Sequence, residues 1–403
     1  MRPIGNSSRT ARVVVVCCVL VIGAFVVAAV PDQPDRLATR FAAEVRIPAP
    51  GETGIAPIGM EGGGAEQNAL LAGTWTTESV EMGDGWYIDQ AYSTSGNAAL
   101  AYVSADRLRF ATYDGARWTA ETIAKGSTMT GVSLAYGPGG AAVSYVGTGK
   151  GGGIKLATRG PLSWVVESVE AGSHGEFTSL AYDGAGNPAI AYLNPNRKVW
   201  DLIYARKVGG AWTRQVVDTG NFRYVALAFD AGFNPPRPAI AYAAATPGTT
   251  SLDTLKFASW DGTAWVRETV LTGTVGYGVF CNLAFHPLTH AATIVHSGSS
   301  ASGGLFTTKA GSTWSTQSFD DCFDYCGRNP SVAFTADGTA WVSSIRWAST
   351  KAQNQMRAAS YDGAAWSREL VDTFSSNWVS VGIAPGGQPT LGYEGVRFAR
   401  RTP

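Results

Sequence analysis

Residues 164–212 read WVVESVEAGSHGEFTSLAYDGAGNPAIAYLNPNRKVWDLIYARKVGGAW, and this stretch decides the fold. It holds four short runs that each suit a β-strand: W-x-x-E/Q-x-V, S-L-A-Y-D, P-A-I-A-Y and a run that other copies spell L-K-F-A. In S-L-A-Y-D, the large Leu180 and Tyr182 alternate with the small Ala181, so one face of the strand is bulky and the other is flat. Both faces are apolar. A sheet built from such strands must therefore be covered on both sides.

The stretch is one copy of a repeat. The tryptophans that open equivalent copies recur 43 to 53 residues apart, at Trp75, Trp118, Trp164, Trp212, Trp265, Trp314 and Trp366. Four-stranded units of this length are typical of β-propellers, whose blades cover one another around an axis. The last copy ends at VRFARRTP without a Trp strand, whereas the first Trp strand, TWTTESV at 74–80, has no unit before it. We therefore predict an all-β, seven-bladed propeller of four-stranded blades over residues 73–403, closed by the N-terminal strand joining the last blade.

Asp-Gly pairs precede several of these tryptophans, as in Asp114-Gly115, Asp261-Gly262 and Asp362-Gly363. Asp-Gly favours tight hairpins because both residues tolerate a positive φ. We expect each Trp to cover the end of its hairpin as structural packing rather than to bind a ligand.

The N-terminus has the pattern of an export sequence. Residues 1–12 carry three arginines and no acid, and residues 13–30 are an unbroken apolar run that ends in small residues. This pattern is typical of a cleaved signal peptide, although the run is also long enough for an uncleaved membrane anchor. Residues 31–72 are rich in Pro, Gly and Ala, which indicates a disordered linker. We expect a secreted or cell-surface protein, with membrane contact only through residues 13–30 if they are retained.

The composition and charge indicate which classes of partner and cofactor to expect. Charged residues make up only 15% of the chain and hydrophobic residues 45%, which supports a folded core. Lys and Arg number 31, as do Asp and Glu, and loss of residues 1–30 would leave 28 basic against 31 acidic residues. That mild acidity gives no reason to expect nucleic acid. The sequence has no phosphate loop, dinucleotide fingerprint or HExxH-like spacing, so we expect no cofactor and no metal.

Three cysteines lie outside the apolar run: Cys281, Cys322 and Cys326. They lack the paired C-x2-C spacing of zinc sites. In an oxidising compartment we expect a disulfide, either between Cys322 and Cys326 or between one of them and Cys281.

The units S-L-A-Y-D-x-x-G-N-P-A-I-A-Y, L-K-F-A and D-G-x-x-W resemble the repeats of exported bacterial β-propellers that are distantly similar to the sialidase, or Asp-box, type. Residues 112–118 (TYDGARW) are one residue shorter than an Asp-box, so they are a variant of that hairpin. The resemblance implies that these hairpins are structural and lie on the face opposite the binding site.

The loops that lead from each outer Trp strand to the next inner strand differ strongly, whereas the hairpins before the tryptophans are alike. Most of the variable loops carry aromatic residues next to the inner strand. We predict that these residues surround the mouth of the central channel and bind a ligand there. The predicted ligand-binding residues are Trp86, Tyr87, His174, Phe177, Arg223, Tyr224, Tyr277, Tyr325, Arg328 and Trp378. The same aromatic residues would also suit a plug that fills the channel.

Two functions fit this pattern. The first is a non-catalytic exported propeller that binds a glycan or a protein at the cell surface through the variable-loop face. The alternative is an extracellular carbohydrate-active enzyme, a polysaccharide lyase or glycoside hydrolase, with His174, Tyr224 and Arg223 supplying a base and a charge neutraliser. An enzyme should show two convergent titratable groups in a pocket, whereas a binding protein should show aromatic rings with few such groups.

Overall fold

The computed structural model describes residues 75–126, 129–148, 151–172, 175–246, 252–273, 280–298, 303–320, 326–347, 354–374 and 376–402. Within these residues the chain forms β-strands and no helix, and they include no helical segment long and apolar enough to cross a membrane. The predicted signal peptide or anchor (1–30) and the predicted linker (31–72) lie outside the described residues.

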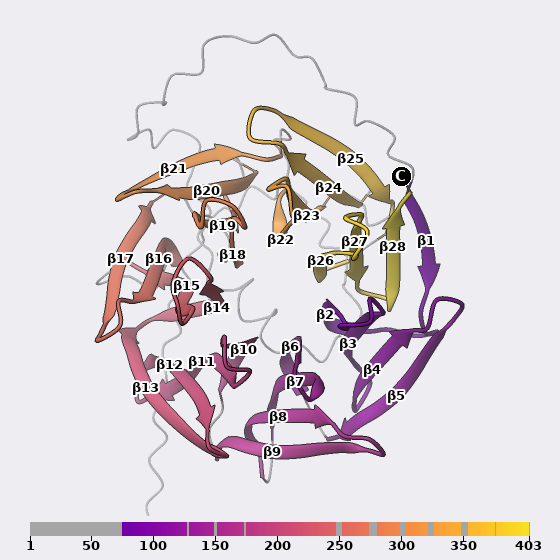
Figure 1. The fold of residues 1–403 in the computed structure, drawn as a ribbon, viewed down its shortest axis with the longest axis horizontal. Helices are drawn as coiled ribbons and strands as arrows, with labels where there is room; N and C mark the ends of the chain where they lie inside the picture. Colours follow the sequence, from indigo (N-terminus) through magenta and orange to yellow (C-terminus); the bar gives the residue numbers. More distant parts are fainter. Residues whose placement is uncertain are drawn as a thin grey trace, which may run out of the picture. The chain divides into compact units, whose positions relative to one another are not determined.

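The strands form seven four-stranded antiparallel sheets around a common axis, which confirms the predicted β-propeller (Figure 1). We number the blades 1 to 7 in chain order, each from its inner to its outer strand. Blades 1 to 3 consist of β2 (Trp86–Tyr92), β3 (Ala98–Ser104), β4 (Arg107–Tyr113) and β5 (Trp118–Lys125); β6 (Met129–Gly137), β7 (Gly140–Gly147), β8 (Gly153–Arg159) and β9 (Trp164–Ala171); and β10 (Glu176–Tyr182), β11 (Pro188–Asn196), β12 (Val199–Val208) and β13 (Ala211–Gly220). Blades 4 to 6 consist of β14 (Phe222–Asp230), β15 (Arg237–Ala245), β16 (Leu252–Trp260) and β17 (Trp265–Thr272); β18 (Cys281–Phe285), β19 (Ala292–Ser297), β20 (Gly304–Ala310) and β21 (Thr313–Ser318); and β22 (Arg328–Phe334), β23 (Ala340–Arg346), β24 (Gln355–Tyr361) and β25 (Trp366–Asp372). Blade 7 consists of β26 (Val379–Ile383), β27 (Pro389–Tyr393), β28 (Arg397–Arg401) and β1 (Trp75–Ser79).

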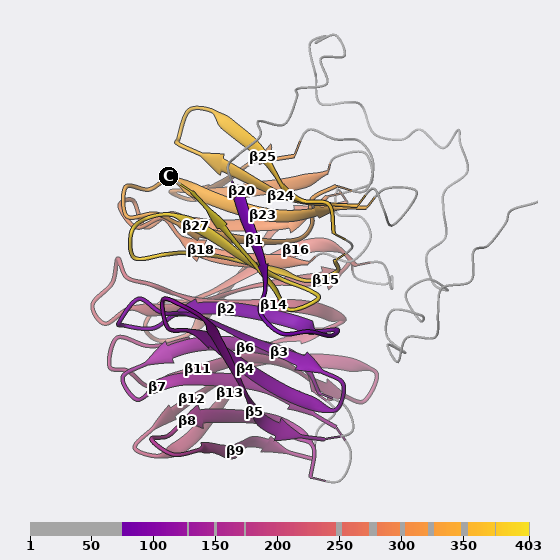
Figure 2. The same ribbon diagram turned by 90° about the vertical axis from the view of Figure 1, so that its right-hand side faces the viewer.

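Blade 7 takes strands from both ends of the sequence, as predicted. β1 pairs antiparallel with β28, in a register that runs from Trp75 opposite Arg401 to Ser79 opposite Arg397. Figures 1 and 2 show β1 beside the strands from the end of the chain. The inner strands β26 and β2 are also in contact, so the ring of inner strands is continuous. Joining the two ends in one sheet leaves no blade incomplete.

The core consists of apolar clusters that each join two neighbouring blades. Between blades 3 and 4, for example, the small Ala189 and Ala191 pack with Leu227, Ile240 and Tyr242. The small face of one blade thus receives the bulky face of the next, as the alternation in S-L-A-Y predicts. A single blade could not bury both of its own faces. The ring solves this, because each sheet is covered by its two neighbours.

A polar side chain at the same place in six inner strands links the blades around the channel. Its oxygen accepts the backbone N–H of the next blade. The acceptors are Asp89 (from Leu134, 2.8 Å), Ser133 (from Leu180, 3.1 Å), Ser179 (from Leu227, 2.9 Å), Asn282 (from Val332, 3.2 Å), Ser331 (from Val381, 3.2 Å) and Ser380 (from Gln90, 3.3 Å). We call these six residues the polar ring. Blade 4 has Ala226 at this place. The polar ring explains why the repeat places Ser directly before Leu.

The outer-strand tryptophans pack on the preceding blade, which makes them structural, as expected. The contact extends beyond the predicted hairpin end, because the partner ring belongs to a neighbouring sheet. The ring pairs that show this are Trp118 with Phe398, Trp164 with Phe110, Trp265 with Tyr204, Trp314 with Phe257, Trp366 with Phe306 and Trp75 with Trp341, at 5.0 to 6.4 Å between centroids. Trp212 joins the cluster between blades 2 and 3.

Cys281 is a free thiol whose Sγ lies 3.7 Å from the Tyr224 carbonyl oxygen, and burial raises its pKa to about 12. The predicted alternative of a disulfide to Cys281 is therefore wrong: this thiol faces a backbone carbonyl between blades 4 and 5. Cys322 lies outside the described residues, so the Cys322–Cys326 disulfide stays a prediction.

Candidate functional site

A shared position at the start of each inner strand carries mostly aromatic residues. From blade 1 to blade 7 it holds Tyr87, Gly131, Phe177, Tyr224, Phe280, Asn329 and Trp378. Residues 87, 131, 177, 224 and 329 have φ between 46° and 58°, and a register shift lies at each of them. A bulky residue in this left-handed region costs on the order of 1–3 kcal/mol. Bulges of this kind re-aim a side chain, and here they do so repeatedly at one end of the channel.

The aromatic rings at this position form a continuous chain across the channel mouth. Ring centroids lie 4.6 Å apart for Phe177 and Tyr224, 4.0 Å for Tyr224 and Phe280, 5.9 Å for Phe280 and Trp378, and 4.5 Å for Trp378 and Tyr87. Phe280 and Trp378 meet although blade 6 separates their strands in the ring. The rings therefore converge over the axis, and we call these five residues the aromatic floor. Tyr224 is 8% exposed, whereas the other four are only half-buried and offer part of their surface to solvent.

Two of the seven positions carry no aromatic ring, and the structure explains each case. A Cβ atom on Gly131 would lie 3.0 Å from the Cα of Phe177, so the backbone of the next blade occupies the space that a side chain would need. Asn329 is buried, and its amide donates to the carbonyl oxygen of Asn377 in blade 7. Asn tolerates the left-handed region better than most residues. These two blades thus support the floor without adding a ring.

The structure brings together four of the predicted residues, Tyr87, Phe177, Tyr224 and Trp378, in the aromatic floor. Three others, His174, Tyr277 and Tyr325, lie outside the described residues. Arg223 and Arg328 lie elsewhere on the variable-loop face: their guanidinium carbons lie 5.5 Å and 4.2 Å from the ring centroids of Trp200 and Trp347.

Trp86, also among the predicted residues, makes no ring contact with the floor in the part of the chain that the structure describes. It is opposite Val103 in its sheet, and the next residue, Tyr87, contacts Trp378. The left-handed bulge causes this shift, because it changes which residue of the strand points toward the axis. Phe280 belongs to the floor, although it is not among the residues predicted to bind the ligand. Its place in the floor follows from alignment of the repeats.

Buried tyrosines link neighbouring blades, because each donates a hydrogen bond to a carboxylate of the preceding blade or of the loop that follows it. Tyr242 of β15 donates to Asp218 of blade 3 at 2.7 Å, and Lys256 donates to the same carboxylate at 2.6 Å. Tyr102, Tyr192 and Tyr393 make the equivalent bonds to Glu81, Glu170 and Asp372. Burial raises the pKa of each of these phenols, and the neighbouring carboxylate raises it further. The phenols therefore stay protonated and act as structural donors rather than as bases.

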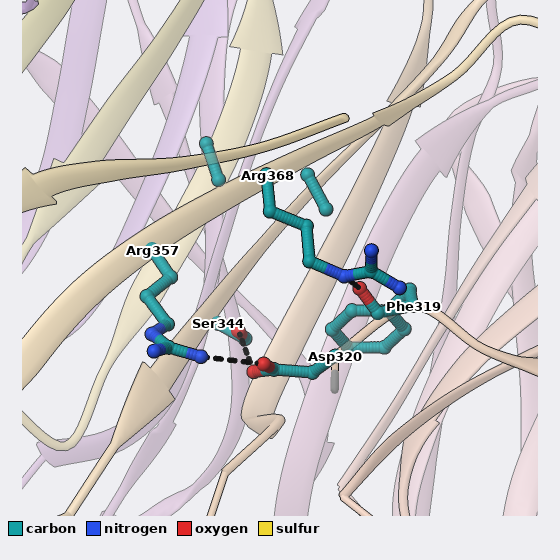
Figure 3. A pocket seen from close by; sticks show the side chains of 7 residues that line it. Phe319, Asp320, Ser344, Arg357 and Arg368 are labelled. Carbon is teal, nitrogen blue, oxygen red and sulfur yellow. Dashed lines mark hydrogen bonds and ion pairs between the residues drawn. The ribbon is translucent and has the colours of Figure 1, made fainter. Parts of the chain in front are cut away.

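Blade 6 has Ser344 where these blades have tyrosine, and the exchange leaves a small cavity (Figure 3). Arg357 donates to Asp320 at 2.6 Å and Ser344 donates at 3.3 Å. Arg368 lines the same cavity and donates to the Phe319 carbonyl oxygen at 2.9 Å. The cavity measures about 10 Å³, which is room for about one water molecule. Three charged side chains, Asp320, Arg357 and Arg368, line the cavity, but it is too small for a substrate.

The sequence matches no protein-family model and no curated protein. It does resemble solved structures. One is an ulvan lyase of polysaccharide lyase family PL25, with a TM-score of 0.59, 9% identity, and coverage of 80% of this chain and 95% of the lyase.

Two further solved structures are also similar. AofleA from Arthrobotrys oligospora gives a TM-score of 0.51 at 13% identity, covering 74% of this chain and 90% of AofleA. The Aleuria aurantia lectin, solved with α-methyl-L-fucoside, gives 0.50 at 13% identity, covering 73% and 98%. At such identities these likenesses show the propeller fold alone.

Proposed function

We propose that the protein is exported and binds a glycan through its variable-loop face, with the aromatic floor as the contact surface. One observation carries the proposal: three blades hold an aromatic residue in the left-handed region so that its ring reaches the channel mouth. Strain of this kind persists only where the surrounding structure enforces it, and it is concentrated at ligand sites. Tyr224 belongs to the apolar cluster between blades 4 and 5, and Phe177, Phe280 and Tyr87 pack against the clusters at one edge, so these rings join the core while the last three keep part of their surface exposed.

The chemistry of the floor suits a sugar. Stacked rings with partly exposed faces attract the C–H face of a pyranose, and the Tyr87 and Trp378 side chains can also hydrogen-bond at their polar atoms. The described part of the floor contains no carboxylate and no cation. A neutral or weakly charged glycan therefore fits it better than a polyanion. A lectin and a polysaccharide lyase among the structural neighbours support a carbohydrate as the ligand class.

A glycan array probed with the purified protein tests the proposal. We expect binding to a defined set of glycans and no depolymerisation of polysaccharides. Binding to whole cells that survives glycosidase treatment, without any glycan on the array, would identify a protein as the ligand instead.

The alternative, a polysaccharide lyase, is favoured only by the likeness to the ulvan lyase. Of its proposed groups, Tyr224 lies between Phe177 and Phe280 and is 8% exposed, which is poor access for a base. A lyase creates an unsaturated uronate that absorbs in the ultraviolet. A rise in this absorbance on incubation with uronate polysaccharides would replace the binding proposal by the lyase.

A further inference from the structure

A groove lies between blades 1 and 2, at the end of β6 opposite the aromatic floor. It has a volume of about 490 Å³, within the range of small-ligand sites. Its walls come from β4 and β5 of blade 1 and from the two hairpins of blade 2. The residues that line it are Phe110, Thr112, Glu121, Tyr136, Gly139, Gly140, Ala141, Arg159, Gly160 and Pro161.

The first hairpin of blade 2 is short and glycine-rich, and its Gly139 and Gly140 line the groove without side chains that would narrow it. Blade 2 connects β6 and β7 through Gly137-Pro138-Gly139-Gly140, whereas blade 3 uses the longer Asp183–Asn187. In blade 3, Asp183 fills the hairpin and accepts a hydrogen bond from Arg206 at 2.6 Å. Blade 2 has Gly137 at that place, where a Cβ atom would overlap the Tyr182 ring of blade 3, so a side chain does not fit there. The half-buried ring of Tyr136 forms part of the groove wall.

An ion pair stands at one side of the groove. Arg159 donates from Nε to Glu121 Oε1 at 2.7 Å and from Nη1 to the Gly160 carbonyl oxygen at 2.6 Å. The side chains are 32% and 38% exposed. Among the residues that the structure describes, Arg159 Nη2, Glu121 Oε2 and the Tyr136 hydroxyl have no hydrogen-bond partner.

At two other blade junctions, both oxygens of the equivalent carboxylate accept hydrogen bonds. Both oxygens of Glu167 accept from Lys207, and both oxygens of Glu369 accept from Arg401, while Trp75 donates to the same Glu369 carboxylate. The Glu121 carboxylate differs from these in keeping an oxygen open to the groove. At this junction an open donor and an open acceptor therefore lie beside the groove.

From this geometry we propose that the groove is a second binding site, and that it takes a single neutral sugar residue. A guanidinium N–H and a carboxylate oxygen can bind adjacent hydroxyl groups, one as acceptor and one as donor, while a pyranose face rests on the Tyr136 ring. The ion pair leaves the site without net charge, so a neutral ligand fits it better than an acidic one. The inference stands on this groove alone and does not depend on the aromatic floor.

The test uses the full chain and a panel of neutral methyl glycosides: glucoside, galactoside, mannoside, fucoside and rhamnoside. Binding is measured by saturation-transfer NMR and calorimetry. We expect at least one glycoside to bind, and Arg159→Gln and Tyr136→Phe each to weaken it about tenfold, as expected for loss of a hydrogen bond to a charged or a buried group. Lys207→Gln removes the equivalent cation one blade further, at a residue that does not line the groove, and should leave the affinity unchanged.

The variants also separate this site from the floor, because Trp378→Ala should not alter glycoside binding in the groove. The proposal is overturned if no glycoside binds, if Arg159→Gln and Tyr136→Phe leave the affinity unchanged, if Lys207→Gln weakens it as much as Arg159→Gln does, or if Trp378→Ala alone abolishes it. In the last case only the variable-loop face binds sugar.

Discussion

Ser331 shows what one hydroxyl contributes to the polar ring. It lies on β22 and is 8% exposed, and its oxygen accepts the Val381 N–H of blade 7 at 3.2 Å. Ser331→Ala leaves this N–H without its acceptor, so we expect unfolding to become easier by about 1–3 kcal/mol in urea titrations. Ser163→Ala, on an exposed hairpin, is the control and should change stability by less than about 0.5 kcal/mol. Equal, small effects of the two variants would mean that the polar ring does not stabilise the blade junctions.

His296 gives the stability a pH dependence whose sign can be worked out. The side chain is fully buried, with Nε2 3.0 Å from the Thr307 hydroxyl, and burial lowers its pKa from 6.5 to about 4. The unfolded chain takes up a proton below about pH 6.5, whereas the folded chain does not do so until about pH 4. The contribution of the neutral ring is therefore present above pH 6.5 and is lost as the pH falls toward 4, by on the order of 3 kcal/mol.

Urea unfolding at about pH 7 and about pH 5 measures this loss, with His296→Gln as the comparison. The variant cannot titrate in this range, so its stability should fall less between the two pH values. An identical fall in both proteins would show that other groups cause the acid sensitivity.

At the scale of elements, β1 has the clearest role, since it is the outer strand of a blade whose other three strands end the chain. It covers the edge of β28, donates from Trp75 to Glu369 at 2.6 Å and pairs Glu78 with Arg400 at 2.7 Å. Deleting residues 73–80 should expose β28 and the Trp341 face, so we expect aggregation and a lower melting temperature. Removing only residues 31–60 keeps β1 and is the control. A 73–80 deletion that stays monomeric and melts normally would contradict the closure.

The elements also show how far the sequence could predict the structure. Strand order, blade count and closure follow from periodic features: the tryptophan spacing, the S-L-A-Y alternation and the incomplete last copy. The contacts at the channel mouth could not be predicted, because they depend on left-handed backbone angles at positions whose residue types do not indicate them. Tyr87 replaces Trp86 in the floor for this reason. The groove between blades 1 and 2 could not be predicted either, because it depends on how residues of two neighbouring blades lie against each other.

For the molecule as a whole, the two faces of the propeller are built differently. The Asp-Gly hairpins close one face with repeated turns, and the aromatic floor spans the channel on the other. The floor is also where the two interpretations of the sequence, ligand mouth and plug, predict different outcomes. Mutual ring contacts alone suit either interpretation, whereas left-handed aromatic residues with partly exposed faces favour a binding surface.

The most direct test compares the affinity of the wild-type protein and of Tyr87→Asn/Trp378→Ala for a glycan identified on the array, with melting temperatures measured in parallel. Asn is chosen at position 87 because blade 6 already has Asn329 at the equivalent left-handed position. Loss of stacking rings at the centre of a site typically costs 2 kcal/mol or more, so we expect affinity to fall by at least about 30-fold while the propeller stays folded. Unchanged affinity together with a much lower melting temperature would contradict the account and identify the aromatic floor as a plug.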